Sequence, residues 1–437
     1  MTERPSANDG GSRRTFLKGS AAVAGAAAVA TSWAPLVHAG GSDVIKVGLV
    51  GAGGRGTGAA EQALKADKGN RLVAVADVFG DRLEESLSAL KGSGVGEQVT
   101  IDDDHKHVGF DAYKQVIDEV DVVVLATTPH FRPLHAAYAV EKGVHAFVEK
   151  PMAVDGPGLR TFLKAARDAK AKNVAIVNGF CWRYHPPRRA TMNRVFDGAI
   201  GEIRAIETTY NSQGVWEPRK TREECGSDME YQLRNWYYYC WLSGDHIVEQ
   251  AIHGLDTMAW AMGDKLPTRC FGVGGRQTRT DPKYGNIYDH FSLVFEYEND
   301  VRGYHQCRHW VNTANQVKDY VLGADGVCDV FGNSIAGKNK WNYKRDTGDK
   351  KTYDMYQVEH DEMYAALREG KILNNGEQAA TSTLLGLMGR AAAYTGGVIT
   401  PETVLESTED LGPSSYSFDD VPLPVPPVPV PGFTKMI

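Results

Sequence analysis

Between residues 43 and 178, short apolar runs alternate with longer stretches in which apolar residues recur at helical spacing. The runs are rich in valine and carry few polar residues, as expected of parallel strands that are covered on both faces. They lie at 44–53, 71–78, 120–129, 144–151 and 174–180. Strict alternation of strand and helix predicts an α/β fold with a doubly wound, Rossmann-type parallel sheet.

The pattern changes after about residue 200. Longer segments with partial two-residue alternation predict strands, and the junction of the last two predicts a hairpin turn. These segments are 202–212, 268–279, 288–300 and 301–311. One helix is expected at 244–262 and a last helix at about 379–396. The second half of the chain is therefore predicted to be an α+β domain with a large open, mostly antiparallel sheet.

These patterns predict four parts of the chain. We expect a signal peptide over 1–39, a dinucleotide-binding domain over 40–178, a substrate and oligomerisation domain over 179–400, and a proline-rich tail over 401–437. The tail contains VPLPVPPVPVPGF, which cannot join the interior of a sheet and is expected to run as an extended strap on the surface. A role in peptide recognition is the alternative.

The N-terminal segment has the features of an export signal. Arg13 and Arg14 precede a weakly apolar, alanine-rich stretch that ends in a small-residue cleavage site after Ala39. This resembles a twin-arginine signal and predicts an exported, periplasmic protein with no membrane span once the signal is removed. A membrane anchor or a plain alanine-rich helix is the alternative, against which Pro35 and the modest hydrophobicity argue.

Composition narrows the class of protein. The chain is 42% hydrophobic and 24% charged, as in soluble globular proteins. Its net charge is −7, and no long basic run lies beyond the N-terminus, which excludes nucleic acid as a partner. Six cysteines without a CxxC pair exclude a zinc ribbon and a disulfide-dense scaffold. We expect free thiols, because the twin-arginine route exports proteins that fold in the reducing cytoplasm.

A glycine-rich turn follows the first predicted strand. VGLVGAGGRGTG places Gly51, Gly53 and Gly56 at GxGxxG spacing, where glycine allows backbone N–H groups to approach a pyrophosphate at a helix N-terminus. Asp77 ends the next strand, where its carboxylate would accept the ribose hydroxyls and repel a 2′-phosphate. This pair predicts NAD rather than NADP. A glycine-rich turn in an unrelated α/β fold is the alternative.

Two further strand ends carry polar motifs. Thr128 ends one strand, and FVEKP places Glu149 and Lys150 directly after the next, at the edge where an open parallel sheet gathers its ligands. With the glycine-rich turn, this pattern resembles the glucose-fructose oxidoreductase, inositol dehydrogenase and MocA family over about residues 44–400. The resemblance implies that Lys150 lies beside the nicotinamide and the reacting carbon. The residues assigned to the cofactor are Gly51, Gly53, Gly54, Arg55, Gly56, Asp77, Thr128, Pro129, His130, Glu149 and Lys150.

The helix expected at 244–262 carries His246, Glu249 and His253 near one face. In the resembled family, an aspartate four residues before a histidine pairs with the motif lysine, and this sequence has Glu249 and His253 at those positions. Lys150, His253 and Glu249 are therefore the candidate catalytic residues. A solvated polar stripe is one alternative. A metal site is another, although the spacing matches no standard zinc motif, and no metal is expected.

Oxidation of a secondary alcohol removes the hydroxyl proton while a hydride leaves the same carbon. His253 would take the proton at neutral pH, while Lys150 would lower the pKa of the alcohol or act as the base itself, and the sequence leaves that choice open. Aromatic segments at 181–187 and 231–241 are expected to form the substrate wall or, alternatively, a domain interface. The candidate substrate-binding residues are Arg183, Tyr184, His246, His253 and Trp236.

The expected function is an exported NAD-dependent oxidoreductase that acts on a sugar, glycoside or cyclitol hydroxyl and binds its NAD tightly, because a periplasm offers no general pool of the cofactor. A redox-neutral, NAD-dependent glycosidase or lyase is one alternative, which Lys150 disfavours. A non-catalytic sensor that holds NAD structurally is the other. The resemblance also implies that open sheets pack face to face in a homodimer or homotetramer.

Overall fold

The computed structural model describes residues 43–419 and 421–435 of the 437-residue chain. The predicted signal peptide, residues 1–39, lies outside the described residues. No helix in the described part of the chain is long and apolar enough to cross a membrane.

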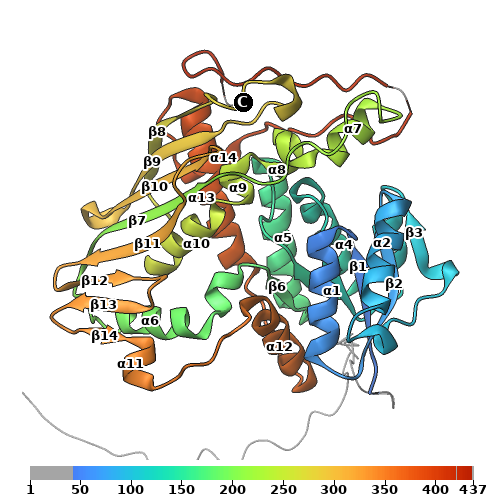
Figure 1. The fold of residues 1–437 in the computed structure, drawn as a ribbon, viewed down its shortest axis with the longest axis horizontal. Coiled ribbons are helices and arrows are strands. Elements are labelled where there is room, and N and C mark those ends of the chain that lie inside the picture. The colour runs from blue at the N-terminus through green and yellow to red at the C-terminus, as the bar shows by residue number, and fades with distance from the viewer. Residues whose placement is uncertain (1–42, 420, 436–437) are drawn as a thin grey trace, which may run out of the picture. The chain divides into compact units, whose positions relative to one another are not determined.

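The first domain is built on a parallel sheet of six strands, in the order β3-β2-β1-β4-β5-β6 (Figure 1). Its apolar strands are almost fully buried, which explains their continuous valine-rich runs. The order reverses between β1 and β4, and such a reversal opens a ligand crevice at the carboxyl ends of the strands. The strands are β1 Ile45–Val50, β2 Asn70–Asp77, β3 Lys106–Val108, β4 Val122–Leu125, β5 His145–Val148 and β6 Ile176–Asn178. The doubly wound sheet is thereby confirmed.

Helices connect these strands on both faces of the sheet. They are α1 Gly54–Ala66, α2 Gly80–Lys91, α3 Ala112–Ile117, α4 Arg132–Lys142 and α5 Gly156–Lys172. The edge strand β3 and helix α3 were not among the predicted elements. Because β3 has only three residues and includes Lys106 and His107, it presents no apolar run.

The second domain is built on an eight-stranded sheet in the order β14-β13-β12-β11-β7-β10-β9-β8. Only the β7–β10 pair is parallel among its adjacent strands, so the predicted mostly antiparallel sheet is confirmed. The predicted hairpin joins β9 to β10. The strands are β7 Ile203–Ser212, β8 Arg269–Gly275, β9 His290–Glu296, β10 Arg302–His309, β11 Gln316–Gly323, β12 Gly326–Asp329, β13 Ser334–Gly337 and β14 Trp341–Asn342.

Helices of the second half cover the sheet and return to the first domain. Helix α12 packs against α1, and α13 packs against both α5 and β8, so the two sheets are joined by packed helices (Figure 1). The helix predicted at 379–396 corresponds to α13 but is not the last, because α14 follows it. These helices are α6 Pro186–Phe196, α7 Asp228–Arg234, α8 Cys240–Ser243, α9 His246–Glu249, α10 Ile252–Ala261, α11 Tyr343–Thr347, α12 Met355–Arg368, α13 Gly376–Thr395 and α14 Pro401–Glu406.

After α14, the described residues of the tail, 407–419 and 421–435, form no helix or strand (Figure 1). The amide of Leu423 donates to Asp228 Oδ2 at 2.9 Å, and the Tyr288 hydroxyl donates to the carbonyl of Pro429 at 2.8 Å. Further along, the amide of Gly432 donates to the carbonyl of Thr395 at 2.9 Å. The proline-rich segment is therefore held to the protein by hydrogen bonds along its length.

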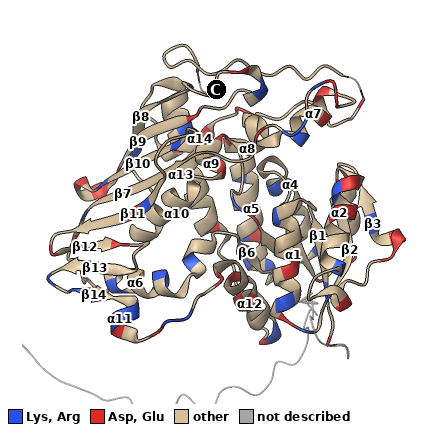
Figure 2. Cartoon of the chain, viewed as in Figure 1, with Lys and Arg blue, Asp and Glu red and all other residues tan. Residues whose placement is uncertain are grey.

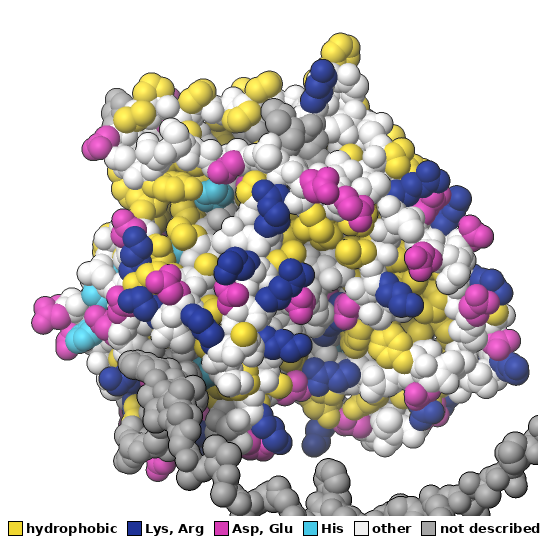
Figure 3. Space-filling view, turned by 180° about the vertical axis from the view of Figure 1, so that it is seen from behind, with side chains coloured by type: hydrophobic (Ala, Val, Ile, Leu, Met, Phe, Trp, Pro, Cys, Tyr) yellow, Lys and Arg dark blue, Asp and Glu magenta, His cyan; other side chains and the backbone are white. Residues whose placement is uncertain are grey.

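Charged residues of both signs are interspersed over the elements of the two domains (Figure 2). On the face shown in Figure 3, apolar side chains gather in several groups with charged side chains around them. The six cysteines are buried, free thiols, as expected.

Candidate active site

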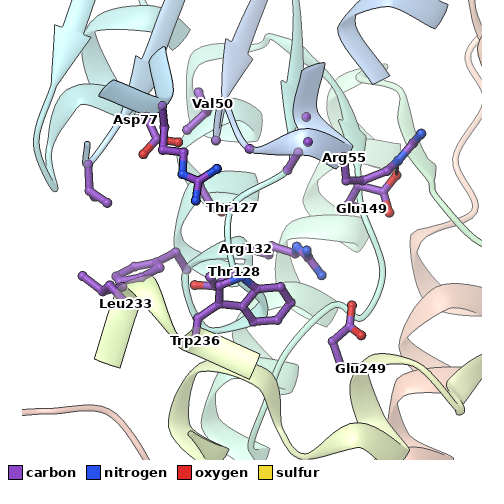
Figure 4. A pocket seen from close by; sticks show the side chains of 18 of the residues that line it. Val50, Arg55, Asp77, Thr127, Thr128, Arg132, Glu149, Leu233, Trp236 and Glu249 are labelled. Atoms are coloured by element: carbon purple, nitrogen blue, oxygen red, sulfur yellow. Dashed lines mark hydrogen bonds and ion pairs between the residues drawn. The ribbon is translucent and has the colours of Figure 1, made fainter. Parts of the chain in front are cut away.

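A cavity of about 480 Å³ lies at the carboxyl ends of the parallel strands, where their order reverses (Figure 4). Residues of both domains line it, so the first sheet supplies its base and the segment from β7 to α10 supplies its other wall. The predicted residues that line it are Gly51, Gly53, Gly54, Arg55, Gly56, Asp77, Thr128, Glu149, Lys150, Trp236, Glu249 and His253.

The glycine-rich turn combines tight packing with open space. Gly51 has φ +95°, and a Cβ there would lie 2.5 Å from the amide nitrogen of Thr127, while a Cβ on Gly56 would lie 1.8 Å from the carbonyl oxygen of Gly51. At Gly53 and Gly54, in contrast, a Cβ would meet no atom within 4 Å. The open positions lie at the start of α1, where the helix N-terminus favours an anion. The turn therefore fits the pyrophosphate of a dinucleotide.

Asp77 is fixed at the end of β2. Its Oδ2 accepts a hydrogen bond from the amide of Ala52 at 2.7 Å, and its Oδ1 accepts one from the amide of Phe79 at 2.9 Å. Burial raises the pKa of Asp77, while these backbone hydrogen bonds lower it. The carboxylate lines the cavity and keeps lone pairs for the two hydroxyls of a ribose.

Arg55 joins the glycine-rich turn to α12. Its Nε lies 2.5 Å from Glu149 Oε1, its Nη2 lies 3.4 Å from Glu359 Oε1, and its guanidinium lies over the ring of Tyr356 at 4.7 Å (Figure 4). Burial, together with the charge of Glu149, raises the pKa of Glu359 well above its usual value. The charge of Arg55 is therefore compensated by Glu149, while Glu359 offers a carboxyl oxygen, and the contribution of Arg55 is to position the turn.

Lys150 and Glu249 form a shielded ion pair. Lys150 Nζ donates to Glu249 Oε1 at 3.0 Å and to the backbone carbonyl of Glu249 at 2.5 Å, and only 13% and 14% of the two side chains are exposed. The side chain of Glu249 thus reaches the lysine.

The prediction of a single helix at 244–262 was wrong, because the chain forms α9 and α10 with a break at Gln250 and Ala251. The break leaves the carbonyl of Glu249 at the end of α9, where it accepts from Lys150. A continuous helix would have used that carbonyl for its own hydrogen bond. The interruption therefore gives Lys150 a second acceptor and fixes its ammonium group.

His253 lies on α10 in a mostly apolar setting. Its ring stacks on Trp182 with centroids 4.8 Å apart, and Phe180 meets it edge-on. Burial, followed by the charges of Lys150 and Arg188, lowers the pKa of His253 well below 6.5. The imidazole is therefore neutral at pH 7 and able to accept a proton.

Two residues assigned to the cofactor do not line the cavity. Pro129 is buried at the start of the short 3-10 helix Pro129–Phe131. His130 turns away, since its Nε2 lies 2.6 Å from the Tyr416 hydroxyl and its ring packs edge-on against Trp241. The assignment of His130 to the cofactor is corrected accordingly: it binds the C-terminal tail.

Three of the predicted substrate-binding residues lie in the protein interior instead. Arg183 Nε donates to Asp256 Oδ1 at 2.9 Å, and its Nη2 donates to Asp264 Oδ1 at 2.6 Å. The Tyr184 hydroxyl accepts from Asn375 Nδ2 at 2.7 Å. His246 is fully buried, outside the lining of the cavity. The buried residues Arg183 and Tyr184 of the 181–187 segment therefore agree with the alternative interpretation, a domain interface.

Several lining residues carried no recognised motif. Tyr210 ends a predicted strand and Gln250 occupies the helix break, so both lie beside residues that were singled out. No sequence pattern singled out Arg132. Its guanidinium is buried, donates to the carbonyl of Pro151 at 2.8 Å and lies between Glu149 and Glu249 (Figure 4). Burial lowers the pKa of Arg132 to about 10.

Within the part of the chain that the structure describes, no group of three His, Cys, Asp or Glu side chains is arranged to hold a metal ion. His246, Glu249 and His253, which the metal interpretation grouped, include one residue outside the cavity lining.

Three family models match the chain. Residues 45–178 match a model described as an oxidoreductase family with an NAD-binding Rossmann fold. Residues 189–329 match one described as the GFO/IDH/MocA C-terminal domain. Residues 12–30 match the signal sequence of the twin-arginine translocation pathway, which indicates export by that route.

Individual relatives match this chain at low sequence identity and over only part of its length. An inositol 2-dehydrogenase of Rhizobium meliloti (strain 1021) is 28% identical over 221 residues, which cover 51% of this chain and 56% of that protein. A glycosyl hydrolase family 109 protein of Shewanella pealeana is 26% identical over 192 residues, which cover 43% of this chain and 40% of that protein. The chain thus spans about half the length, or less, of these curated relatives.

A similar fold occurs in the crystal structure of an aldose-aldose oxidoreductase from Caulobacter crescentus complexed with glycerol. The TM-score is 0.62 at 16% sequence identity, over 82% of this chain and 99% of that one.

Proposed function

The chain belongs to the Gfo/Idh/MocA oxidoreductase family, and on that premise we propose that it transfers a hydride between a tightly held NAD and a hydroxyl carbon of a sugar, glycoside or cyclitol. The single observation that carries the proposal is the placement of the Lys150–Glu249 ion pair and neutral His253 in the cavity of the glycine-rich turn. We propose the periplasm as the place of action, since the signal matches the twin-arginine route.

NAD, when bound, supplies the hydride acceptor. Lys150 donates to the carboxylate and the carbonyl of Glu249, which position its Nζ to stabilise negative charge on the substrate oxygen and to lower the pKa of the hydroxyl. The neutral imidazole of His253 takes the proton. Oxidation thus sends the proton to His253 and the hydride to the cofactor, and reduction reverses both transfers. Because Lys150 is paired with Glu249, we propose His253 as the base.

Aromatic residues supply the proposed substrate wall. Trp236, Trp216 and Tyr210 line the cavity on the side of the second domain, and flat rings suit the apolar faces of sugars. Arg219 lies over the Trp216 ring at 4.2 Å and offers donors at the rim. These features support a polyhydroxylated substrate.

The second candidate function is redox-neutral cleavage of a glycoside through transient oxidation of a ring carbon. The similarity to a glycosyl hydrolase family 109 protein favours it. Such an enzyme would need the same base and cofactor but would return the hydride, so only its products distinguish it. If NAD had a purely structural role, the arrangement of Lys150, Glu249 and His253 in the cavity would have no chemical explanation.

We test the proposal by purifying the protein without added cofactor and measuring NAD(H) released per chain after denaturation. Close to one NAD(H) per chain is expected, since a cofactor retained through export needs nanomolar affinity, or about 12 kcal/mol. Incubation with a panel of sugars, glycosides and cyclitols should then change the NADH absorbance or yield a cleaved glycoside. An empty protein that binds NAD only at high micromolar concentration would contradict the proposal.

We also propose that copies of this chain pair through the open sheet, as a homodimer or homotetramer. Val273 on β8 and Tyr304 on β10 are large apolar residues left exposed on that sheet, at 67% and 42%.

Replacing Asp77 by alanine is expected to weaken the preference for NAD over NADP by about tenfold or more, because the fixed carboxylate no longer repels a 2′-phosphate. Arg82, which also lines this end of the cavity, would then offer the phosphate a cation. Fluorescence titrations of both cofactors measure the ratio. Asp111→Ala is the matched control, since that side chain is 82% exposed and lies outside the cavity. An unchanged ratio in Asp77→Ala would show that Asp77 does not reach the ribose.

A further inference from the structure

The adenosine half of the cavity lies over β2 and β3. A dinucleotide crosses the point where strand order reverses, and the acid at the end of β2 takes the adenosine ribose. Beyond Asp77, the lining continues with Phe79 after β2 and with Gly109 and Phe110 after β3. The purine of a bound dinucleotide therefore belongs in the region that these two phenylalanines border.

The C-terminal tail reaches this region. The ring of Phe418 stacks on Phe79 with centroids 5.5 Å apart and packs on Phe110 at 5.0 Å. The ring of Tyr416 packs on Phe110 at 5.7 Å, and its hydroxyl lies 2.6 Å from His130 Nε2. Two aromatic residues of the tail thus cover two aromatic residues of the cavity.

Helix α7 contacts the same region from the second domain. The Arg234 guanidinium lies 3.7 Å from the centroid of the Phe79 ring, and its Nη1 lies 2.7 Å from Asp81 Oδ2. Leu233 and Arg234 themselves line the cavity. Phe79 is therefore enclosed by a cation from the second domain and by a ring from the tail.

The covering segment is fixed on both sides. Before it, the amide of Leu411 donates to Asp155 Oδ2 at 3.2 Å. After it, the amide of Leu423 donates to Asp228 Oδ2 at 2.9 Å, and Gln232 Nε2 donates to the Leu423 carbonyl at 2.6 Å. Asp228 and Gln232 both lie on α7, so the tail is tied to the helix that also holds Phe79.

We propose that residues 413–419 are part of the cofactor site: Tyr416 and Phe418 pack against Phe79 and Phe110, the rings that line the adenine slot, and thereby slow the release of NAD. The inference rests on the proposed function, because it names the element that retains the cofactor of that site. Aromatic rings bind a purine by stacking, and the tail segment, which is anchored at both ends, holds the two lining rings in place. The glycine-rich turn and Asp77 determine which cofactor binds, whereas the tail determines how long it stays.

The test compares Phe418→Ala with Phe433→Ala in the full chain. Phe418 is 38% exposed, so its truncation leaves the core intact, and Phe433 is an 84% exposed phenylalanine of the same tail. The measurements are NAD(H) content after purification and the rate at which bound NADH is lost, followed by its fluorescence after dilution. Phe418→Ala is expected to release NADH at least tenfold faster and to retain less NAD(H). Phe433→Ala is expected to match the wild type.

A chain that ends after residue 412 provides the second variant and should release NADH at least as fast as Phe418→Ala. Wild-type release rates in both Phe418→Ala and the shortened chain would overturn the inference and leave the proposed function standing. If the wild-type protein binds no NAD(H), the proposed function fails instead. The two failures are therefore distinguishable.

Discussion

Replacement of Lys150 by methionine is expected to lower kcat about 10²- to 10⁴-fold, the range attributed to a positioned proton-transfer or charge-stabilising group. Methionine keeps much of the length of the side chain and removes its charge, so the substrate hydroxyl loses the cation that lowers its pKa. Glu249 would lose the partner that it meets at 3.0 Å. Steady-state rates with saturating NAD and the best substrate of the panel measure the effect.

Lys164→Met is the matched control. That lysine lies on α5, is 77% exposed and pairs only locally with Asp168, so its loss should leave kcat within about twofold. Thermal unfolding of both variants separates lost chemistry from lost stability. Turnover near the wild-type value in Lys150→Met would remove Lys150 from the mechanism.

His253→Ala is expected to lower kcat by at least about 10²-fold, because it removes the proton acceptor. The pH dependence makes the prediction specific. Burial lowers the pKa of His253 well below 6.5, so the neutral, active form is present above that lowered pKa and is lost only as the pH falls through it. The wild-type kcat should therefore stay level from pH 8 to well below about 6.5 and decline only as the pH falls through the lowered pKa. This acidic limb should be absent in the variant.

His105→Ala serves as the control, since His105 is an exposed histidine paired with Asp102, away from the cavity. It should retain both the wild-type rate and the acidic limb. An acidic limb that persists unchanged in His253→Ala would assign the proton to another group.

The elements predicted most securely were those whose sequence pattern is compatible with only one local structure. Buried parallel strands require apolar runs, so β1, β2, β4, β5 and β6 were predictable, and the turn from Gly51 to Gly56 is constrained by backbone contacts that no larger residue permits. The strands from β11 to β14 were missed. Three of them, β12 to β14, have four residues or fewer, which is too short for any periodicity to show.

The site was only partly predictable, because helical spacing shows which residues share a face and leaves open what the face meets. His246 and His253 were placed on one helix face, yet the break at Gln250 separates them, and His246 enters the core. The hydrogen bond between His130 and Tyr416 joins positions 286 residues apart, and no local pattern indicates it. Arg132 was missed for the same reason, since no local pattern shows that its guanidinium lies between two distant carboxylates, Glu149 and Glu249.

The position of the tail along the chain has a consequence for the order of assembly. Protein synthesis proceeds from the N-terminus, and domains fold as units as they emerge. Residues 413–419 leave the ribosome after both sheets are complete, so the glycine-rich turn can form and accept a dinucleotide before Phe418 reaches Phe79. Packing of the tail against Phe79 and Phe110 is then a late step of folding. The cofactor would then bind in the compartment where the protein is synthesised, before the protein is exported.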